Sequence, residues 1–145
     1  MSEVPKSWTV ITRAANWDRS QANRAIRAVL QQGMPDGIFA ANDEMALGAV
    51  EALQGAGVRR DEWPIIIGFD ATADAIHAIE EGLMCATIAQ SPKEIGKAGL
   101  LAAFDLWKDP NAINNIPGME NGVMLVDVRV IPERSNCEGP GKSGP

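Results

Sequence analysis

The sequence predicts an α/β protein built on a doubly wound parallel sheet. Short apolar runs rich in β-branched residues alternate four times with stretches of helical periodicity, and this order favours parallel strands joined by right-handed crossovers. The run "PIIIGFD" (64–70) is apolar almost throughout, as expected for a parallel strand covered on both faces. With 145 residues, the chain fits one domain with a core of its own.

Two strands and two helices are expected in the first half of the chain. "SWTVITRAA" (7–15) is rich in β-forming residues and predicts the first strand. Residues 19–33 carry apolar side chains at helical spacing, and a glycine ends this helix. A Pro-Asp-Gly turn leads into the short strand "DGIFAAN" (36–42), and residues 43–57 follow as a helix with acids in its first turn.

The second half repeats this pattern. The strand at 64–70 leads into a helix at 72–82, and "CATIAQ" (85–90) is the next strand. A long helix from Ser91 to Lys108 has serine at its N-cap and proline at its first position. "GVMLVDVRVI" (122–131) predicts the closing strand.

The composition indicates the extent of the folded domain and the kinds of partner it can bind. Residues 1–131 are expected to form the folded module, and the Gly-, Pro- and Ser-rich residues 132–145 a disordered tail. The formal charge is −6, the pI is about 4.7 and no basic cluster occurs. Nucleic acid and anionic membranes are therefore poor partners.

No cofactor, metal or membrane segment is expected. The two cysteines and the single His77 lack the spacing of a metal site, and no apolar run is long enough for a membrane span. The opening "MSEVPKSWTV" has no apolar stretch typical of an export signal, so we expect this polypeptide to remain in the cytoplasm where it is made.

Polar or aromatic side chains follow four of the predicted strands: Trp17, Asn42, Asp70 and Gln90. Open α/β sheets bind ligands outside the carboxyl ends of their strands. Amides and a carboxylate suit sugar hydroxyls, which both donate and accept hydrogen bonds, and an indole offers a flat face to a sugar ring. No nucleophile–base pair accompanies these residues, so the pattern predicts binding without catalysis.

Each of these residues also has a purely structural interpretation. Asn42 is placed to cap the helix at 43–57, although Asp43 is equally placed to do so, which would leave Asn42 for the ligand. Asp70 is placed to cap the helix that begins near Thr72. Trp17 would pack in its loop, and Gln90 would be an ordinary loop residue.

Several segments resemble the C-terminal half of the ribose-binding-protein-like periplasmic sugar-binding proteins, the solute-binding components of ABC transporters. The resemblance rests on "ANWDR", "GIFAANDEMALGAVEAL", "IIIGFDATADAIHAIEEG" and "ATIAQSPKEIGKAG", and it runs from about Trp8 to Ile131. It implies that Trp17 stacks on the sugar, that Asn42 and Asp70 bind its hydroxyls, and that Gln90 contributes from the hinge. Trp17 stands where the ribose binders usually have phenylalanine, so the identity of the sugar stays open.

The resemblance also implies parts that this sequence does not contain. Family members close two lobes around the sugar, and the sequence matches only part of one, so it holds half of the ligand site. The helix from Ser91 to Lys108 would normally pack on the other lobe. Without that lobe its apolar side chains lose their cover, and we expect the chain to self-associate through this helix.

Two other functions are compatible with this fold class. An effector-binding domain of a LacI-type transcription regulator shares the fold, but the sequence shows no helix-turn-helix. An enzyme would need a phosphate loop, a metal cluster or a nucleophile–base pair, and the sequence shows none of them. We therefore predict a sugar-binding protein rather than an enzyme.

Overall fold

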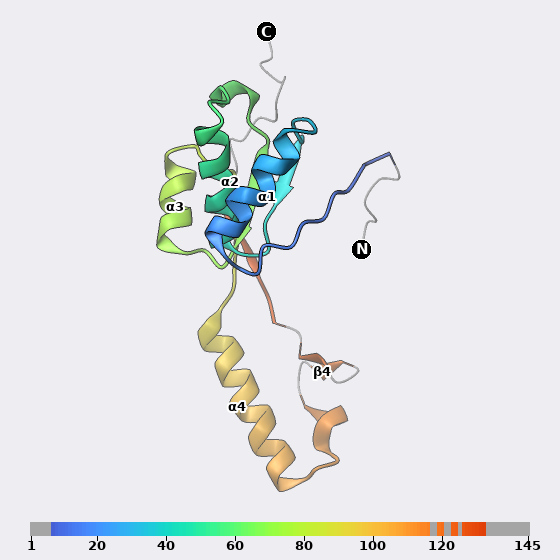
Figure 1. Ribbon diagram of the computed structural model, residues 1–145. Helices are drawn as coiled ribbons and strands as arrows, with labels where there is room; N and C mark the ends of the chain where they lie inside the picture. The colour runs from blue at the N-terminus through green and yellow to red at the C-terminus, as the bar shows by residue number, and fades with distance from the viewer. Residues whose placement is uncertain (1–6, 117–118, 121–122, 125, 133–145) are drawn as a thin grey trace.

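The computed structural model describes residues 7–116, 119–120, 123–124 and 126–132 (Figure 1). They form a four-stranded sheet of order β1-β2-β3-β6 and a separate two-stranded sheet, β4-β5. In chain order the elements are α1 (Arg19–Leu30), β1 (Gly37–Phe39), α2 (Asp43–Gly55), the 3-10 turn η1 (Arg60–Glu62), β2 (Ile65–Phe69), α3 (Ala73–Glu80), β3 (Ala86–Ala89), α4 (Pro92–Lys108), the 3-10 turn η2 (Ala112–Asn115), β4 (Met119–Glu120), β5 (Val123–Met124) and β6 (Arg129–Ile131). The predicted α/β class is confirmed.

The main sheet is mixed rather than wholly parallel. β1, β2 and β3 run parallel, whereas β6 pairs antiparallel with β3, with Arg129 opposite Ala89. The chain leaves the sheet where β3 ends, runs out along α4 and returns to the same end (Figure 1). A parallel strand would require a crossover to the far end of the sheet, so the returning strand runs antiparallel. The strand predicted at 122–131 is thus divided between β5 and β6.

The strand predicted at 7–15 is absent. Its side chains Trp8, Val10 and Ile11 are exposed, and among the described residues no strand pairs with this segment. High β propensity alone does not make a strand, because its backbone groups need a neighbouring strand as partner.

The hydrophobic core lies on one face of the sheet. Leu53 of α2 and Ile66 of β2 are almost completely buried there, together with small residues of α3. The alternate residues Ile65, Ile67 and Phe69 point to the opposite face and are only partly buried. In the described part of the chain, α2 and α3 therefore cover one face, and the sequence-based expectation of cover on both faces is not met.

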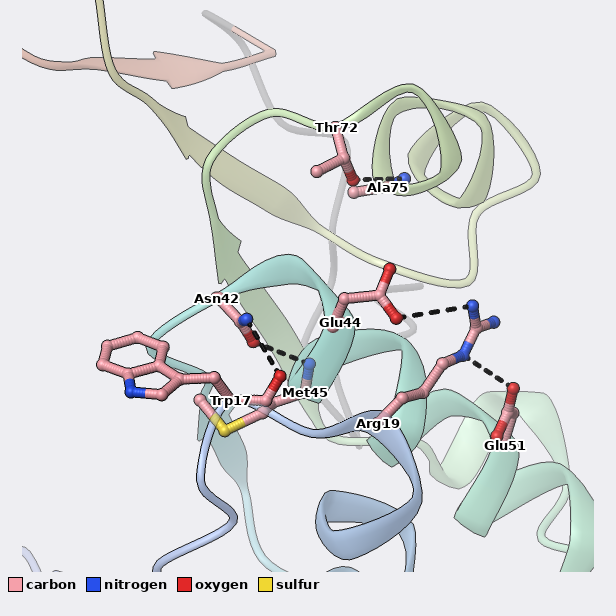
Figure 2. Close-up of polar contacts among 8 residues, drawn as sticks. All are labelled: Trp17, Arg19, Asn42, Glu44, Met45, Glu51, Thr72 and Ala75. Carbon is pink, nitrogen blue, oxygen red and sulfur yellow. Dashed lines mark hydrogen bonds and ion pairs between the residues drawn. The ribbon is translucent and has the colours of Figure 1, made fainter. Parts of the chain in front are cut away.

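Helix α1 packs on α2 rather than on the sheet. The contact is close at Gly48, where a Cβ atom would collide with the backbone carbonyl of Arg19 and meet the Cβ of Ala22. The guanidinium of Arg19 lies 2.8 Å from the carboxylate of Glu51 through its Nε, and 4.0 Å from that of Glu44 (Figure 2). The Nε lacks the alignment of a hydrogen bond, so the contact with Glu51 is ionic.

Helix α4 projects away from the α/β unit (Figure 1). Only its Ala102 is buried, whereas a set of large apolar side chains is exposed: Ile95, Leu100, Leu101, Phe104 and Trp107. Ser91 occupies the N-cap position but its side chain makes no capping hydrogen bond. Among the described residues, no helix is long and apolar enough to cross a membrane. The tail predicted at 132–145 lies outside the described residues, apart from Pro132.

Candidate functional site

Asp70 and Gln90 meet at the carboxyl ends of β2 and β3. The Gln90 side-chain amide donates a 2.6 Å hydrogen bond to Oδ1 of Asp70. The two strands end side by side because Phe69 pairs with Ile88. Asp70 is exposed and Gln90 is half-buried, so a carboxylate and an amide face solvent together.

The capping alternative for Asp70 is excluded. Helix α3 is capped by Thr72, whose hydroxyl accepts a 3.3 Å hydrogen bond from the N–H of Ala75 (Figure 2). The Asp70 backbone N–H donates to the carbonyl of Ile88 at 2.9 Å. The Asp70 side chain therefore does not cap α3, and it is exposed to solvent.

Trp17 and Asn42 form a second pair at the same edge of the sheet. The Asn42 amide donates a 3.3 Å hydrogen bond to the backbone carbonyl of Trp17. The Trp17 side chain is 65% exposed, and Figure 2 shows its indole extending away from α2. Asn42 follows β1 as Asp70 follows β2, and Phe39 pairs with Ile67 in these neighbouring strands.

Of the two residues that the sequence places equally well to cap α2, the structure selects Asn42 rather than Asp43. Oδ1 of Asn42 accepts a 2.9 Å hydrogen bond from the N–H of Met45 and is the cap (Figure 2). The amide N–H₂ of Asn42 still has one donor beyond its bond to Trp17. Asn42 therefore has a structural role in addition to any contact with ligand.

Asp43 is the residue of this region whose role the sequence did not reveal. It is completely buried and accepts hydrogen bonds from the Thr87 hydroxyl at 2.7 Å and the Thr72 N–H at 2.7 Å. It thus joins the start of α2 to β3 and to the loop after Asp70. The one sequence signal for this buried position was Gly68 inside an apolar strand. A glycine there often marks a place where another group approaches the strand closely.

The chemistry of the site is that of hydrogen bonding and stacking. Its groups are an exposed carboxylate and indole and two half-buried amides, which suit a polyhydroxylated ring with one apolar face. No group of metal-ligating side chains occurs among the described residues. His77 lies on the exposed surface of α3 beside Glu80 and Glu81, away from the strand ends.

The family model of the periplasmic binding protein domain matches residues 1–111. The chain belongs to this family of periplasmic binding proteins. The ribose import binding protein RbsB of Haemophilus influenzae is 37% identical over 123 residues, which are 84% of this chain and 38% of that protein. The D-allose-binding periplasmic protein of Escherichia coli is 36% identical over 106 residues, 72% of this chain and 33% of the relative.

Solved structures agree with the sequence relatives. The Caulobacter myo-inositol binding protein, solved with myo-inositol, superposes with a TM-score of 0.63 at 33% identity and covers 74% of this periplasmic binding protein chain. The solute-binding protein of Actinobacillus succinogenes, solved with D-allose, gives a TM-score of 0.61 at 32% identity over 82% of the chain. The chain covers 38% of each of these structures and so spans well under half the length of its relatives.

Proposed function

We propose that the chain binds a monosaccharide or a related polyol as part of the solute-binding protein of an ABC importer. The relatives are named for ribose, D-allose and myo-inositol, all of which are compact polyols. Binding without catalysis is part of the proposal, because the groups at the strand ends are suited to hydrogen bonding rather than to bond cleavage.

The observation that carries the proposal is the hydrogen bond between Gln90 and Asp70. It holds a carboxylate and an amide together at the carboxyl ends of two parallel strands, the edge where open α/β sheets bind ligands. A carboxylate accepts from sugar hydroxyls, and an amide both accepts and donates. The exposed indole of Trp17 supplies a stacking face, and Asn42 retains one N–H donor beside it.

The ligand residues in this proposal are Trp17, Asn42, Asp70 and Gln90. Since Asp70 and Trp17 are exposed to solvent, we expect weak binding, with a Kd of about 1 mM or above. Together with a second lobe, the site would bind more tightly and deliver its sugar to an ABC permease, with hinge closure around the ligand as the signal.

Calorimetry of this chain against D-ribose, D-allose and myo-inositol tests the proposal. We expect heat with at least one of them, and loss of that heat in Asp70→Ala and in Trp17→Ala. Matched controls are Asp36→Ala, a carboxylate before β1 at the other end of the strand, and Trp107→Ala, an exposed indole on α4. Heat that persists in both site variants, or that is lost equally in the controls, would contradict these residue assignments.

Self-association through α4 is a separate part of the proposal. Leu100 and Trp107 are 74% and 79% exposed, and Phe104 stacks on Trp107 with ring centroids 6.1 Å apart. An apolar stripe of this kind favours a partner surface. Sedimentation velocity at micromolar concentration should show oligomers that Leu101→Asp converts to monomers, whereas Gln32→Asp, which adds the same negative charge at an exposed residue just after α1, should leave them intact.

A further inference from the structure

The loop that carries Asp70 has an unusual backbone. Asp70 has φ of 113° and Ala71 has φ of 57°, in the left-handed region that non-glycine residues seldom adopt. Residues are held in such conformations only where the surroundings determine them strongly. The direction of the Asp70 carboxylate therefore depends on whatever fixes this loop.

Three consecutive backbone N–H groups of the loop donate to fixed acceptors. Asp70 donates to the carbonyl of Ile88 at 2.9 Å, Ala71 to the hydroxyl of Thr87 at 3.2 Å, and Thr72 to the carboxylate of Asp43 at 2.7 Å. The Thr87 hydroxyl in turn donates to the other oxygen of Asp43 at 2.7 Å. Two of the three contacts thus depend on Asp43, directly or through Thr87.

The surroundings of Asp43 suit a buried carboxylate. It is the first residue of α2, where the helix dipole favours a negative charge. Gly68 of β2 leaves it space, since a Cβ at position 68 would collide with Oδ1 of Asp43. Asp43 and Thr87 are the two buried polar residues of the described chain, and they bond to each other.

We infer that Asp43, acting through Thr87, is a positioning residue that sets the geometry of the sugar-binding Asp70. Asp43 is completely buried, so it cannot contact a ligand at the surface. Its effect passes through the backbone of residues 70–72. The effect of Asp43 on sugar binding rests on the proposed function. Its effect on the geometry of the loop does not depend on that function.

Amide hydrogen exchange of the sugar-free chain tests the structural part. In the unmodified protein the N–H of Thr72 should exchange much more slowly than that of Asp74, which lies in the first turn of α3, where helical N–H groups have no intrahelical acceptor. Thr87→Val removes the acceptor of the Ala71 N–H and one partner of Asp43. It should therefore speed exchange at Ala71 by roughly twofold to tenfold, the range for a neutral hydrogen bond, and should also speed exchange at Thr72, because its acceptor Asp43 is then less firmly held. Asp43→Asn should have a similar effect, and Thr87→Ser should restore slow exchange.

The N–H of Leu53 serves as the reference for overall unfolding. If the variants speed exchange at Leu53 as much as at Ala71 and Thr72, Asp43 merely stabilises the fold and the inference is wrong. Equal exchange of Thr72 and Asp74 in the unmodified chain would also overturn it, with no variant required.

Calorimetry with D-ribose, D-allose and myo-inositol then tests the binding part, because Thr87→Val should weaken any binding at least fivefold and Thr87→Ser should restore it. A chain that binds none of the three but shows the exchange pattern would refute the proposed function and not the role of Asp43 in the loop.

Discussion

The amide of Gln90 and the carboxylate of Asp70, 20 positions apart in the chain, are joined by a 2.6 Å hydrogen bond at the ends of adjacent parallel strands. Because Gln90 begins the connection to α4 and Asp70 begins the connection to α3, this bond ties together the two segments that leave the sheet at this edge. It also orients the carboxylate that we propose as the main acceptor of sugar hydroxyls.

Replacement of Gln90 should distinguish loss of this donor from charge repulsion. Gln90→Ala should lower the free energy of unfolding by about 1 kcal/mol, the net value of one hydrogen bond. Gln90→Glu should cost more at neutral pH, because it places a second carboxylate beside Asp70. Urea unfolding of both variants measures the difference, and equal effects would mean that the observed bond does not persist in solution.

Asn42 should prove important for stability through its role as a cap. Asn42→Ala should cost about 0.5–2 kcal/mol, because the N–H of Met45 loses its acceptor. Asn42→Asp retains the acceptor for Met45 but turns the donor to the Trp17 carbonyl into a second acceptor, so it should cost less stability than Asn42→Ala without matching the unmodified protein. Thermal unfolding of the two variants provides the comparison, and a stable Asn42→Ala chain would contradict the capping geometry.

A methyl group at position 68 should be harmful. Gly68→Ala would push against Asp43, Met84 and Ala46, and overpacking of this kind costs about 1–3 kcal/mol. The matched control is Gly96→Ala in α4, where a Cβ meets nothing within 4 Å and where alanine should stabilise the helix by roughly 0.5–1 kcal/mol. Opposite signs in chemical denaturation are the expected result, and similar effects at both sites would contradict the packing around Asp43.

The exposed pair Arg59 and Glu62 should show a small pH dependence. A hydrogen bond from Arg59 at 2.8 Å, together with its charge, lowers the pKa of Glu62 below the ordinary carboxyl value. The stability that this pair contributes is therefore fully present above the pKa of Glu62 in the unfolded chain, and it is lost as the pH falls through the lowered pKa of the folded state. Titration of the Glu62 carboxyl by NMR measures the shift. Arg59→Leu should abolish it, and Arg27→Leu, which removes an arginine bonded instead to Asn23, should not.

Local patterns predicted most of the elements well. The apolar run ending in Gly-Phe became β2, and the acids that begin α2 and the proline that begins α4 mark helix starts that the structure confirms. These features depend on neighbours in the chain, on helical periodicity and on backbone preferences, all of which are present in the sequence itself. The alignment of Asn42, Asp70 and Gln90 along one edge likewise follows from the order of parallel strands.

The features that were predicted wrongly or left undecided all depend on contacts between segments that are distant in the sequence. Residues 7–15 have the composition of a strand but pair with no strand in the described part of the chain. The direction of β6 is set by the end of the sheet to which the chain returns after α4. The sequence could not decide whether Asn42 or Asp43 caps α2, because either side chain fits a cap by local rules. Only the space beside Gly68 and the hydroxyl of Thr87 favour Asp43 for the interior.

The sequence by itself determined the α/β class, the positions of Asn42, Asp70 and Gln90 at strand ends, and the resemblance to sugar-binding proteins, whereas it placed Trp17 after a strand that the structure lacks. The tertiary structure alone decided that these four residues form two hydrogen-bonded pairs and that a buried carboxylate holds the loop of one of them. The physical reason is that residue type and spacing govern local conformation, whereas burial and hydrogen-bond pairing depend on which surfaces meet when the chain folds.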